Sequence, residues 1–483
     1  MAHKTRPYLF YSATRALCGT CLRVVDAKEL IEGERVYLWK RCPEHGVSRV
    51  LLSDDAEYFR LGREAFLKAP EQVEHHNTGV EHGCPYDCGI CPDHEQHGCV
   101  TLLEITDHCN LRCPTCYASS GPERLSHRPL AQIERMLDRI VANEREPDVV
   151  QISGGEPTLH PDFFAVLDAC RKRPIRHLML NTNGLRIARE DGFAERLARY
   201  APRFEVYLQF DSLSAEPQRV LRGADLRRIR EEALDRLDAL NLSTTLVVTL
   251  RRGLNDHEIG DILRYAASRR CVRGVTLQPV QDAGRVEGFD AEAHRLTISE
   301  VRRKLVEQFP TFTKEDVLPV PCHPDSLAMA YAIKGTGEAA GTIAPLTRFV
   351  DRKLLVEGGR NTIVLEDDPE LRLRFSRALF ETFSTAHGPE SASRSLSQLL
   401  CCLPQVEALP ELTYDRVFRV VIMQFLDRHT MDLRSVRKSC VHIAHPDGER
   451  VIPFDTYNVL YRDRLEEDVL VPLRARVERM GGG

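Results

Sequence analysis

Between residues 101 and 280 the chain alternates short apolar runs with longer amphipathic segments, and this alternation constrains the fold more than any other feature. The short runs have the length and the β-branched content of buried strands, and they lie at 101–106, 148–153, 177–182, 205–210, 244–249 and 274–280. The segments between them have helical periodicity, and they lie at 129–145, 161–172, 186–200, 224–240 and 256–269. We therefore predict an α/β fold, in which a parallel sheet curls into a partial barrel of six (βα) units. Polar chemistry is expected at the carboxyl ends of its strands.

Segments of a different character flank this core, and we predict four units: 1–55, 56–100, 101–310 and 311–483. The first unit has strand-like runs at 35–40 and 48–53, and its core is too small to be stable without an additional cross-link such as a bound metal ion. The second begins near a predicted helix at 54–69 and continues as a polar linker. The last unit is predicted to be mainly helical, with amphipathic helices at 370–386 and 414–429 and a strand at 449–455.

The chain contains sixteen cysteines, and their short spacings favour metal sites over a disulfide framework. Its start lacks the apolar stretch of an export signal, and no apolar run approaches the roughly 18 residues of a membrane helix, so we expect a cytoplasmic protein. A net charge of -5 argues against a dedicated nucleic-acid binder and leaves small molecules or lipids as substrates. Cys170 and Cys271 stand alone, and we interpret them as buried structural thiols.

Cys109, Cys113 and Cys116 form a C-x3-C-x2-C motif directly after the first strand of the predicted barrel. Three thiolates on one short loop can hold three irons of a 4Fe-4S cluster and leave the fourth iron open for another ligand. A zinc knuckle is the alternative for this spacing taken alone.

A second group of cysteines precedes the same strand with the spacing C-x3-C-x2-C-x7-C, and it consists of Cys84, Cys88, Cys91 and Cys99. Four thiolates can close a cluster completely, so we predict an auxiliary 4Fe-4S cluster here, with structural zinc as the alternative. Five histidines surround this motif, and we predict that most of them are solvated loop residues; they are His75, His76, His82, His94 and His97.

The N-terminal unit carries Cys18 and Cys21 in a CxxC motif and Cys42 in the stretch KRCPEHG. His45 follows three residues after Cys42 and is the candidate fourth ligand. This pattern is typical of a rubredoxin-like or zinc-ribbon site, which would hold one iron or zinc ion and stabilise the unit.

The cysteine loop resembles that of the radical S-adenosylmethionine (radical SAM) enzymes, because the aromatic Tyr117 follows the third cysteine and SGGEP follows the second strand. The resemblance implies a partial TIM-like barrel whose open iron binds S-adenosylmethionine, which one electron cleaves to a hydrogen-abstracting 5'-deoxyadenosyl radical. It places the methionine amino group at Gly154, Gly155 and Glu156. The resemblance also assigns the binding of the ribose, carboxylate and adenine groups of S-adenosylmethionine to residues at the strand ends, which are Asn183, Gln209, Asp211 and Gln278. A helix cap is the alternative role for a strand-end Asn or Asp.

Longer stretches are similar to one group of these enzymes, the archaeal tetraether lipid synthases and pterin-linked methyltransferases. The matching stretches are GCPYDCGICPDHEQHGC, CNLRCPTCYA, YLQFDSL…LRGADL at 207–226, VRGVTLQPVQDAGR and SCVHIAHPDGERVIPFDTYN. The resemblance implies carbon–carbon bond formation at an unactivated sp3 carbon of a lipid chain. It also implies a reductant such as a ferredoxin or flavodoxin, and it is compatible with peripheral membrane contact. Methylation or alkylation of a small heterocycle such as a pterin is the alternative, and a non-catalytic iron–sulfur protein is the alternative of another class.

The C-terminal part departs from the archaeal pattern, which carries a further auxiliary cluster there. Cys322 and Cys440 match two of its ligands, whereas Ser326 and Asp455 stand where cysteines are expected. Asp455 could ligate iron through oxygen. A rearranged site completed by Cys401 and Cys402 is the other possibility, and these two could also be buried thiols.

Overall fold

The computed structural model describes residues 6–66, 68–71, 73–335, 340–357, 373 and 416–481. The predicted helix at 370–386 lies outside the described residues except for Leu373, and Cys401 and Cys402 lie outside them entirely.

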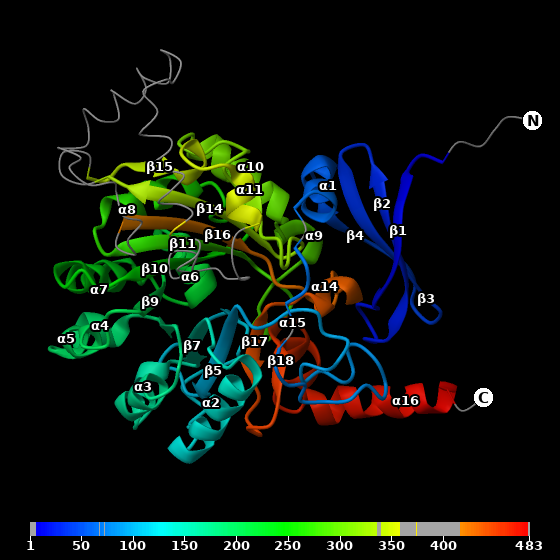
Figure 1. Ribbon diagram of the computed structural model, residues 1–483, viewed down its shortest axis with the longest axis horizontal. Coiled ribbons are helices and arrows are strands. Elements are labelled where there is room, and N and C mark those ends of the chain that lie inside the picture. The colour runs from blue at the N-terminus through cyan, green and yellow to red at the C-terminus, as the bar shows by residue number, and fades with distance from the viewer. Residues whose placement is uncertain are drawn as a thin grey trace, which may run out of the picture.

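Six parallel strands form the predicted barrel sheet, side by side in chain order. They are β5 (Val100–Thr106), β7 (Val149–Gly154), β8 (His177–Thr182), β9 (Phe204–Gln209), β10 (Thr244–Leu250) and β11 (Val272–Pro279). The crossover helices are α2 (Leu130–Glu144), α3 (Phe163–Arg171), α4 (Leu185–Arg189), α5 (Phe193–Ala198), α7 (Arg227–Ala239) and α8 (Ile259–Ser268). Figure 1 shows these helices along the outer side of the strands. The prediction of six (βα) units is confirmed, and the predicted helix 186–200 is divided at Gly192, which adopts a positive φ of 77°.

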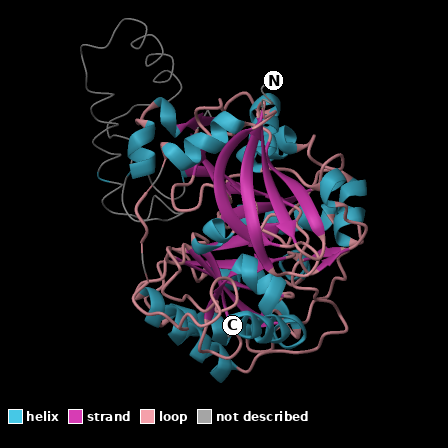
Figure 2. Cartoon of the chain, turned by 90° about the vertical axis from the view of Figure 1, so that its right-hand side faces the viewer, coloured by secondary structure: helices cyan, strands magenta, loops and turns pink. Residues whose placement is uncertain are grey.

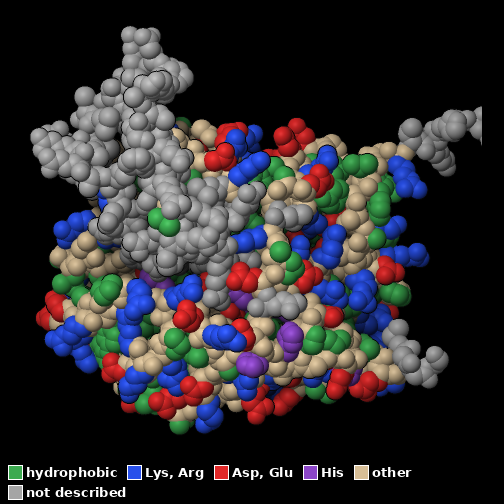
Figure 3. Space-filling model, viewed as in Figure 1, with side chains coloured by type: hydrophobic (Ala, Val, Ile, Leu, Met, Phe, Trp, Pro, Cys, Tyr) green, Lys and Arg blue, Asp and Glu red, His purple; other side chains and the backbone are tan. Residues whose placement is uncertain are grey.

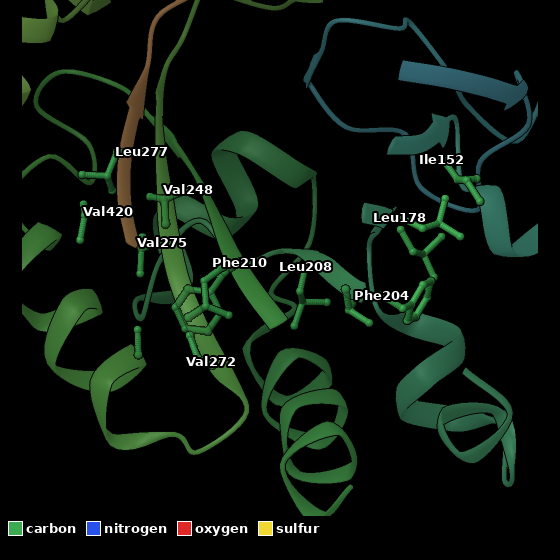
Figure 4. Close-up of a cluster of buried hydrophobic side chains, with 14 of the residues drawn as sticks. Ile152, Leu178, Phe204, Leu208, Phe210, Val248, Val272, Val275, Leu277 and Val420 are labelled. Carbon is green, nitrogen blue, oxygen red and sulfur yellow. The ribbon is translucent and has the colours of Figure 1, made fainter. Parts of the chain in front are cut away.

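Side chains from the strands and the surrounding helices form one continuous core. Figure 4 shows part of it, in which Ile152, Leu178, Phe204, Phe210 and Val248 follow one another across the sheet on the side of the helices. Cys170 and Cys271 are buried in this core, as predicted.

The C-terminal segment extends the sheet at both edges. β16 (Val417–Met423) lies parallel to β11, and β14 (Leu327–Lys334) lies antiparallel to β16. At the other edge, β17 (Val441–Ala444) lies parallel to β5, and β18 (Val451–Pro453) lies antiparallel to β17. Together with the six barrel strands, these strands belong to one continuous sheet. In Figure 2, where all strands are magenta, the separate N-terminal sheet faces the viewer and this sheet lies behind it.

The helix predicted at 414–429 is therefore wrong, whereas the strand predicted near 449–455 is confirmed as β18. All seven residues of β16 are buried. A strand that is covered on both faces loses the alternating pattern and has a continuous apolar run instead, which sequence periodicity cannot distinguish from a buried helix.

The N-terminal unit is a four-stranded antiparallel sheet, in the order β1 (Leu9–Leu17), β2 (Val24–Glu32), β3 (Arg35–Cys42) and β4 (Gly46–Ser53). The helix α1 (Ala56–Glu64) follows it, and Asp55 caps the helix by accepting a hydrogen bond from the Tyr58 amide at 2.8 Å. The buried Lys40 attaches the sheet to the C-terminal segment, because its Nζ donates to the carbonyls of Leu17 at 2.9 Å and His429 at 2.7 Å.

The other elements are short. They include β6 (Thr115–Cys116), α6 (Ala215–Arg222), β12 (Arg285–Val286), α9 (Ala291–His294), α10 (Ile298–Gln308), β13 (Leu318–Pro319), β15 (Ile343–Pro345), α11 (Arg352–Glu357), α14 (Leu433–Arg437), α15 (Phe454–Thr456) and α16 (Val471–Gly481). Among the described residues, we find no helix with the length and apolar character to cross a membrane. On the face of Figure 3, basic and acidic side chains are intermixed.

Candidate active site

The C-x3-C-x2-C loop lies at the carboxyl end of β5, where the barrel rule places chemistry. The loop is held in place from the far side of the barrel. Thr115 and Cys116 form β6, which pairs with β12, and Nε of Arg285 donates to the carbonyl of Cys113 at 2.7 Å. The backbone of the three cysteines is therefore fixed relative to the segment that follows β11.

A cavity of about 160 Å³ lies inside the barrel, directly below this loop. Cys109, Cys113 and Cys116 all line it. Five of the predicted cofactor-binding residues with strand-end positions also line it, and these are Gly154, Gly155, Asn183, Gln209 and Gln278. Apolar side chains complete the wall, and these include Val100, Leu102, Met179, Val247, Val275, Val421, Met423 and Val441. The cavity thus joins a thiolate-rich, polar end to an apolar interior.

Gly154 and Gly155 are at positions where no side chain fits. A Cβ atom on Gly154 would overlap the backbone oxygen of Thr106, and one on Gly155 would overlap that of His108. Gly154 also has a φ of 121°, which side chains disfavour. The glycines therefore let β7 pack directly against the backbone that leads into Cys109.

Glu156 is buried and does not line the cavity. Its carboxylate accepts hydrogen bonds from the hydroxyl of Thr182 at 2.7 Å and from the amides of Asn183 at 2.8 Å and Thr158 at 3.2 Å. Burial raises the pKa of Glu156, and these hydrogen bonds oppose the rise. The geometry favours a bracing role, in which Glu156 fixes the end of β8 and with it Asn183.

Asp211 is also buried away from the cavity, and its partner Arg222 is the residue that lines it. The Arg222 guanidinium donates to both carboxylate oxygens of Asp211 at 2.6 Å and to the hydroxyl of Thr249 at 2.9 Å. Burial raises and the Arg222 charge lowers the pKa of Asp211, with a net lowering. Sequence reasoning missed Arg222, although its position in LRGADL after the strand-end aspartate was a usable signal.

Tyr117 lies in a polar chain at the edge of the cavity. Its hydroxyl is 2.9 Å from the Ser153 hydroxyl, to which Nδ2 of Asn181 donates at 3.2 Å. The Tyr117 ring packs against Phe454, with 5.1 Å between the centroids. Oδ1 of Asn181 and Oε1 of Gln281 are buried and have no hydrogen-bond partner among the described residues, and both residues line the cavity. Unpartnered polar atoms at a cavity wall indicate a site that accepts a polar ligand.

Cys84, Cys88 and Cys91 lie together on one loop, in a small pocket that also contains Asp93 and His94. Their predicted fourth ligand, Cys99, does not join them. Its sulfur lies 4.0 Å from that of Cys322, which lies 3.8 Å from that of Cys440. The structure thus separates the predicted four-cysteine set, because β17 pairs with β5 and brings Cys440 beside Cys99.

Two of the five histidines near this loop are not solvated. His94 and His97 are buried, whereas His75 and His76 are exposed and His82 is partly buried. Nε2 of His94 lies 3.1 Å from Nε2 of His442, and Nδ1 of His97 lies 3.1 Å from the Glu144 carboxylate. These two are the exceptions to the prediction of mostly solvated histidines, because the loop packs beneath the C-terminal segment.

The predicted N-terminal metal ligands lie together. The sulfurs of Cys21 and Cys42 are 3.8 Å apart, and Nδ1 of His45 is 3.7 Å from the Cys18 sulfur and 3.5 Å from the Cys42 sulfur. Burial raises the pKa of the Cys42 thiol, but the hydrogen bond from His45 and neighbouring backbone hydrogen bonds outweigh this effect and lower the pKa to about 6. This donor set fits one tetrahedral metal ion.

Ser326 and Asp455, which stand where the archaeal pattern has cysteines, make hydrogen bonds to other parts of the chain. The Ser326 hydroxyl is 3.2 Å from Nε2 of His323. The Asp455 carboxylate accepts hydrogen bonds from the Leu426 amide at 2.7 Å and the Ser439 hydroxyl at 2.9 Å. Both Asp455 oxygens therefore hold loops together.

Comparison with known proteins gives the family. The model for the radical SAM superfamily matches residues 103–266, and the model for the HMPTM N-terminal zinc ribbon domain matches residues 10–54. A relative from Methanocaldococcus jannaschii, named 7,8-dihydro-6-hydroxymethylpterin dimethyltransferase, is 31% identical over 97% of this chain and 98% of its own. The chain belongs to the radical SAM superfamily.

Two further matches are more distant. GTP 3',8-cyclase from Brucella ovis is 28% identical over 61% of this chain and 84% of its own. A crystal structure of Streptococcus suis SuiB bound to S-adenosylmethionine matches 44% of this chain and 46% of its own, with a TM-score of 0.35 and 17% identity.

Membership of the radical SAM superfamily makes this protein an enzyme that uses a 4Fe-4S cluster and S-adenosylmethionine and that needs a reductant. It contradicts the alternative of a non-catalytic iron–sulfur protein. The residues fit these cofactors, because three thiolates and the unpartnered oxygens of Asn181 and Gln281 meet at one cavity. The N-terminal zinc-ribbon prediction is confirmed at the level of the domain.

Proposed function

We propose that this radical SAM enzyme forms a carbon–carbon bond at an unactivated sp3 carbon of a lipid chain held in the barrel. The observation that carries the proposal is the apolar end of the cavity. Val100 and Leu102 belong to the first half of β5, and Val441 pairs with Val100 at the start of β17. They lie at the opposite end of β5 from the cysteine loop, so an alkyl chain that points away from the cofactors is stabilised there by burial against apolar side chains.

In this proposal, Cys109, Cys113 and Cys116 hold the cluster, and Asn183, Gln209 and Gln278 orient S-adenosylmethionine. When bound, these cofactors supply a radical that removes a hydrogen atom from carbon. The residues of this chain position the reactants and exclude water: the Arg222–Asp211 pair forms part of the polar wall, Glu156 braces Asn183, and the valine-lined floor shields the reacting carbon.

A second candidate is methylation or alkylation of a heterocycle such as a pterin. It is favoured by the name of the Methanocaldococcus jannaschii relative and by polar groups in the wall of the cavity. Gln151, Thr245, Thr276 and Arg419 line the cavity and could hydrogen-bond to a heterocycle. Arg419 already pairs with the buried Glu205 at 2.7 Å.

The reductant is proposed to be a small electron carrier such as a ferredoxin or flavodoxin, and access to lipid is proposed to involve peripheral membrane contact from the cytoplasmic side. Flotation of the protein with phospholipid vesicles tests the membrane contact. Recovery of the protein only in the soluble fraction would contradict it.

Deuterium transfer separates the two substrates. The cluster-loaded enzyme is incubated without oxygen with S-adenosylmethionine, reductant and either a lipid with deuterated chains or a deuterated pterin. Label in 5'-deoxyadenosine from the lipid alone supports the proposal, and label from the pterin alone supports the second candidate.

Two buried valines provide a matched control. Val441 lines the apolar end of the cavity beside Val100, and Val420 belongs to the outer core. Val441→Thr puts a hydroxyl at the proposed alkyl site and should reduce label transfer from lipid about tenfold, because an unpaired buried hydroxyl costs about 1–3 kcal/mol. Val420→Thr should lower stability but leave label transfer per folded enzyme unchanged. Equal label transfer by both variants would contradict an alkyl group at this wall.

A further inference from the structure

Three cysteines from distant parts of the chain meet at one point, where the sequence predicted Cys322 and Cys440 but not Cys99. Cys99 immediately precedes β5, Cys322 follows β13 in a turn, and Cys440 immediately precedes β17. All three side chains are buried, with exposed fractions of 0%, 1% and 0%. Their sulfurs lie within 4.8 Å of one another.

The spacing of these sulfurs matches a single metal ion. Neighbouring sulfurs are 4.0 Å apart for Cys99 and Cys322 and 3.8 Å apart for Cys322 and Cys440. A tetrahedral zinc ion with bonds of about 2.3 Å holds its thiolates about 3.8 Å apart. The N-terminal site of the same chain, with 3.8 Å between Cys21 and Cys42, has this spacing too.

The two cysteine loops assigned to clusters provide an internal contrast. In the described part of the chain, only two groups of at least three Cys, His, Asp or Glu side chains have every ligand atom within 4.8 Å. These groups are the N-terminal site and the Cys99 group. In the two C-x3-C-x2-C loops the three sulfurs do not all lie within this distance of one another. This wider spacing suits a cluster, because the several irons of a cluster hold their thiolates farther apart than a single metal ion does. We propose that Cys99, Cys322 and Cys440 bind one thiolate-preferring divalent metal ion, zinc or iron, and not a 4Fe-4S cluster.

The position of this site suggests what the metal ion does. Val100 and Val441, the next residues after Cys99 and Cys440, pair with each other across β5 and β17, and both line the cavity. A metal ion at the three sulfurs joins these two strands at the floor of the cavity. It also ties in the Cys322 turn, where Asp325 accepts hydrogen bonds from Arg63 at 2.7 Å and Ser435 at 2.6 Å.

The simpler alternative is that the three thiols are packed as small apolar groups. Isolated buried cysteines behave in this way, and Cys170 and Cys271 are examples in this chain. Three thiols from three segments with near-tetrahedral spacing are better explained by a shared ligand, and the alternative predicts no metal ion.

The test counts mononuclear metal in the full-length, cluster-loaded protein. Zinc and iron are measured by mass spectrometry and acid-labile sulfide by colorimetry. Iron in 4Fe-4S clusters is matched by sulfide, so mononuclear metal equals zinc plus the excess of iron over sulfide. We expect about two such ions per wild-type chain, and about one in either Cys18→Ser or Cys322→Ser. Cys271→Ser, the matched control for a buried thiol, should keep about two.

Several results would overturn the proposal. An unchanged metal count in Cys322→Ser would mean that the thiols are only packed. Loss of about four irons together with about four sulfides would mean that the group holds a cluster. If Cys322→Ser does not fold, the other samples still decide: about one mononuclear ion in the wild type, or none in Cys18→Ser, would contradict a second site. None of these counts depends on the substrate of the enzyme.

Discussion

Replacing Arg222 with methionine should destabilise the protein strongly, because it removes the countercharge of a buried carboxylate. Asp211 has no exposed side-chain surface, and both of its oxygens accept from Arg222 at 2.6 Å. In Arg222→Met, the amide of Thr249, at 3.1 Å, is the main hydrogen-bond donor that remains for this carboxylate. Breaking a buried ion pair from one side costs about 3–5 kcal/mol, and we expect the free energy of unfolding to fall by that amount.

The double variant Arg222→Met/Asp211→Asn tests the physical reason. It removes the charge that the single variant leaves unpaired, so it should regain at least about 2 kcal/mol. The measurement is urea unfolding without oxygen, with equal m-values as a control for an unchanged transition. Release of 5'-deoxyadenosine should stay low in both variants, since Arg222 also lines the cavity. The reasoning is refuted if the single variant loses less than about 1 kcal/mol, or if the double variant is no more stable than the single one.

Three further predictions concern other parts of the molecule. Burial raises the pKa of Asp455 to about 7 against the opposing hydrogen bonds, so the folded protein keeps this proton at a pH where the unfolded chain releases it. The free energy of unfolding, relative to that of Asp455→Asn, should therefore fall by about 1.4 kcal/mol per pH unit between pH 5 and 7. Urea midpoints of the two proteins that change in parallel with pH would contradict this. Gly155→Ala should slow 5'-deoxyadenosine release about 100-fold, because the new Cβ displaces the backbone of His108 before the cysteine loop. Gly79→Ala, whose Cβ meets nothing within 4 Å, should leave the rate unchanged, and equal rates for the two variants would refute the claim. Lys40→Met removes the Nζ donor from the carbonyls of Leu17 and His429 and should destabilise the docked N-terminal sheet by about 2 kcal/mol or more. The measurement is amide hydrogen exchange in the strands of this sheet, which should become faster. Unchanged exchange would show that Lys40 does not hold the sheet in place.

The barrel could be predicted because its signal is local. Each strand and helix of the core has its own periodicity, and the motifs after the strands fall at the carboxyl ends for the same reason. The C-x3-C-x2-C loop and the glycines at 154 and 155 could be placed at one cavity on this basis alone.

The placement of Cys99 beside Cys322 and Cys440 could not be predicted, since it depends on strand pairing between distant segments. Cys99 follows Cys91 closely in the sequence, yet β17 returns to β5 and places Cys440 next to it. The burial of His94 has the same origin, because its ring lies against His442 of β17. For β16 the obstacle was different: a strand buried on both faces has no alternation to recognise.

The most direct test of the account is the release of 5'-deoxyadenosine by fully iron-loaded protein, incubated without oxygen with S-adenosylmethionine and a reductant. We predict release by the wild type and none by Cys109→Ala, in which the auxiliary and N-terminal metal centres should remain. Absence of 5'-deoxyadenosine from the fully loaded wild type, or equal release by Cys109→Ala, would contradict the assignment of this loop as the active site.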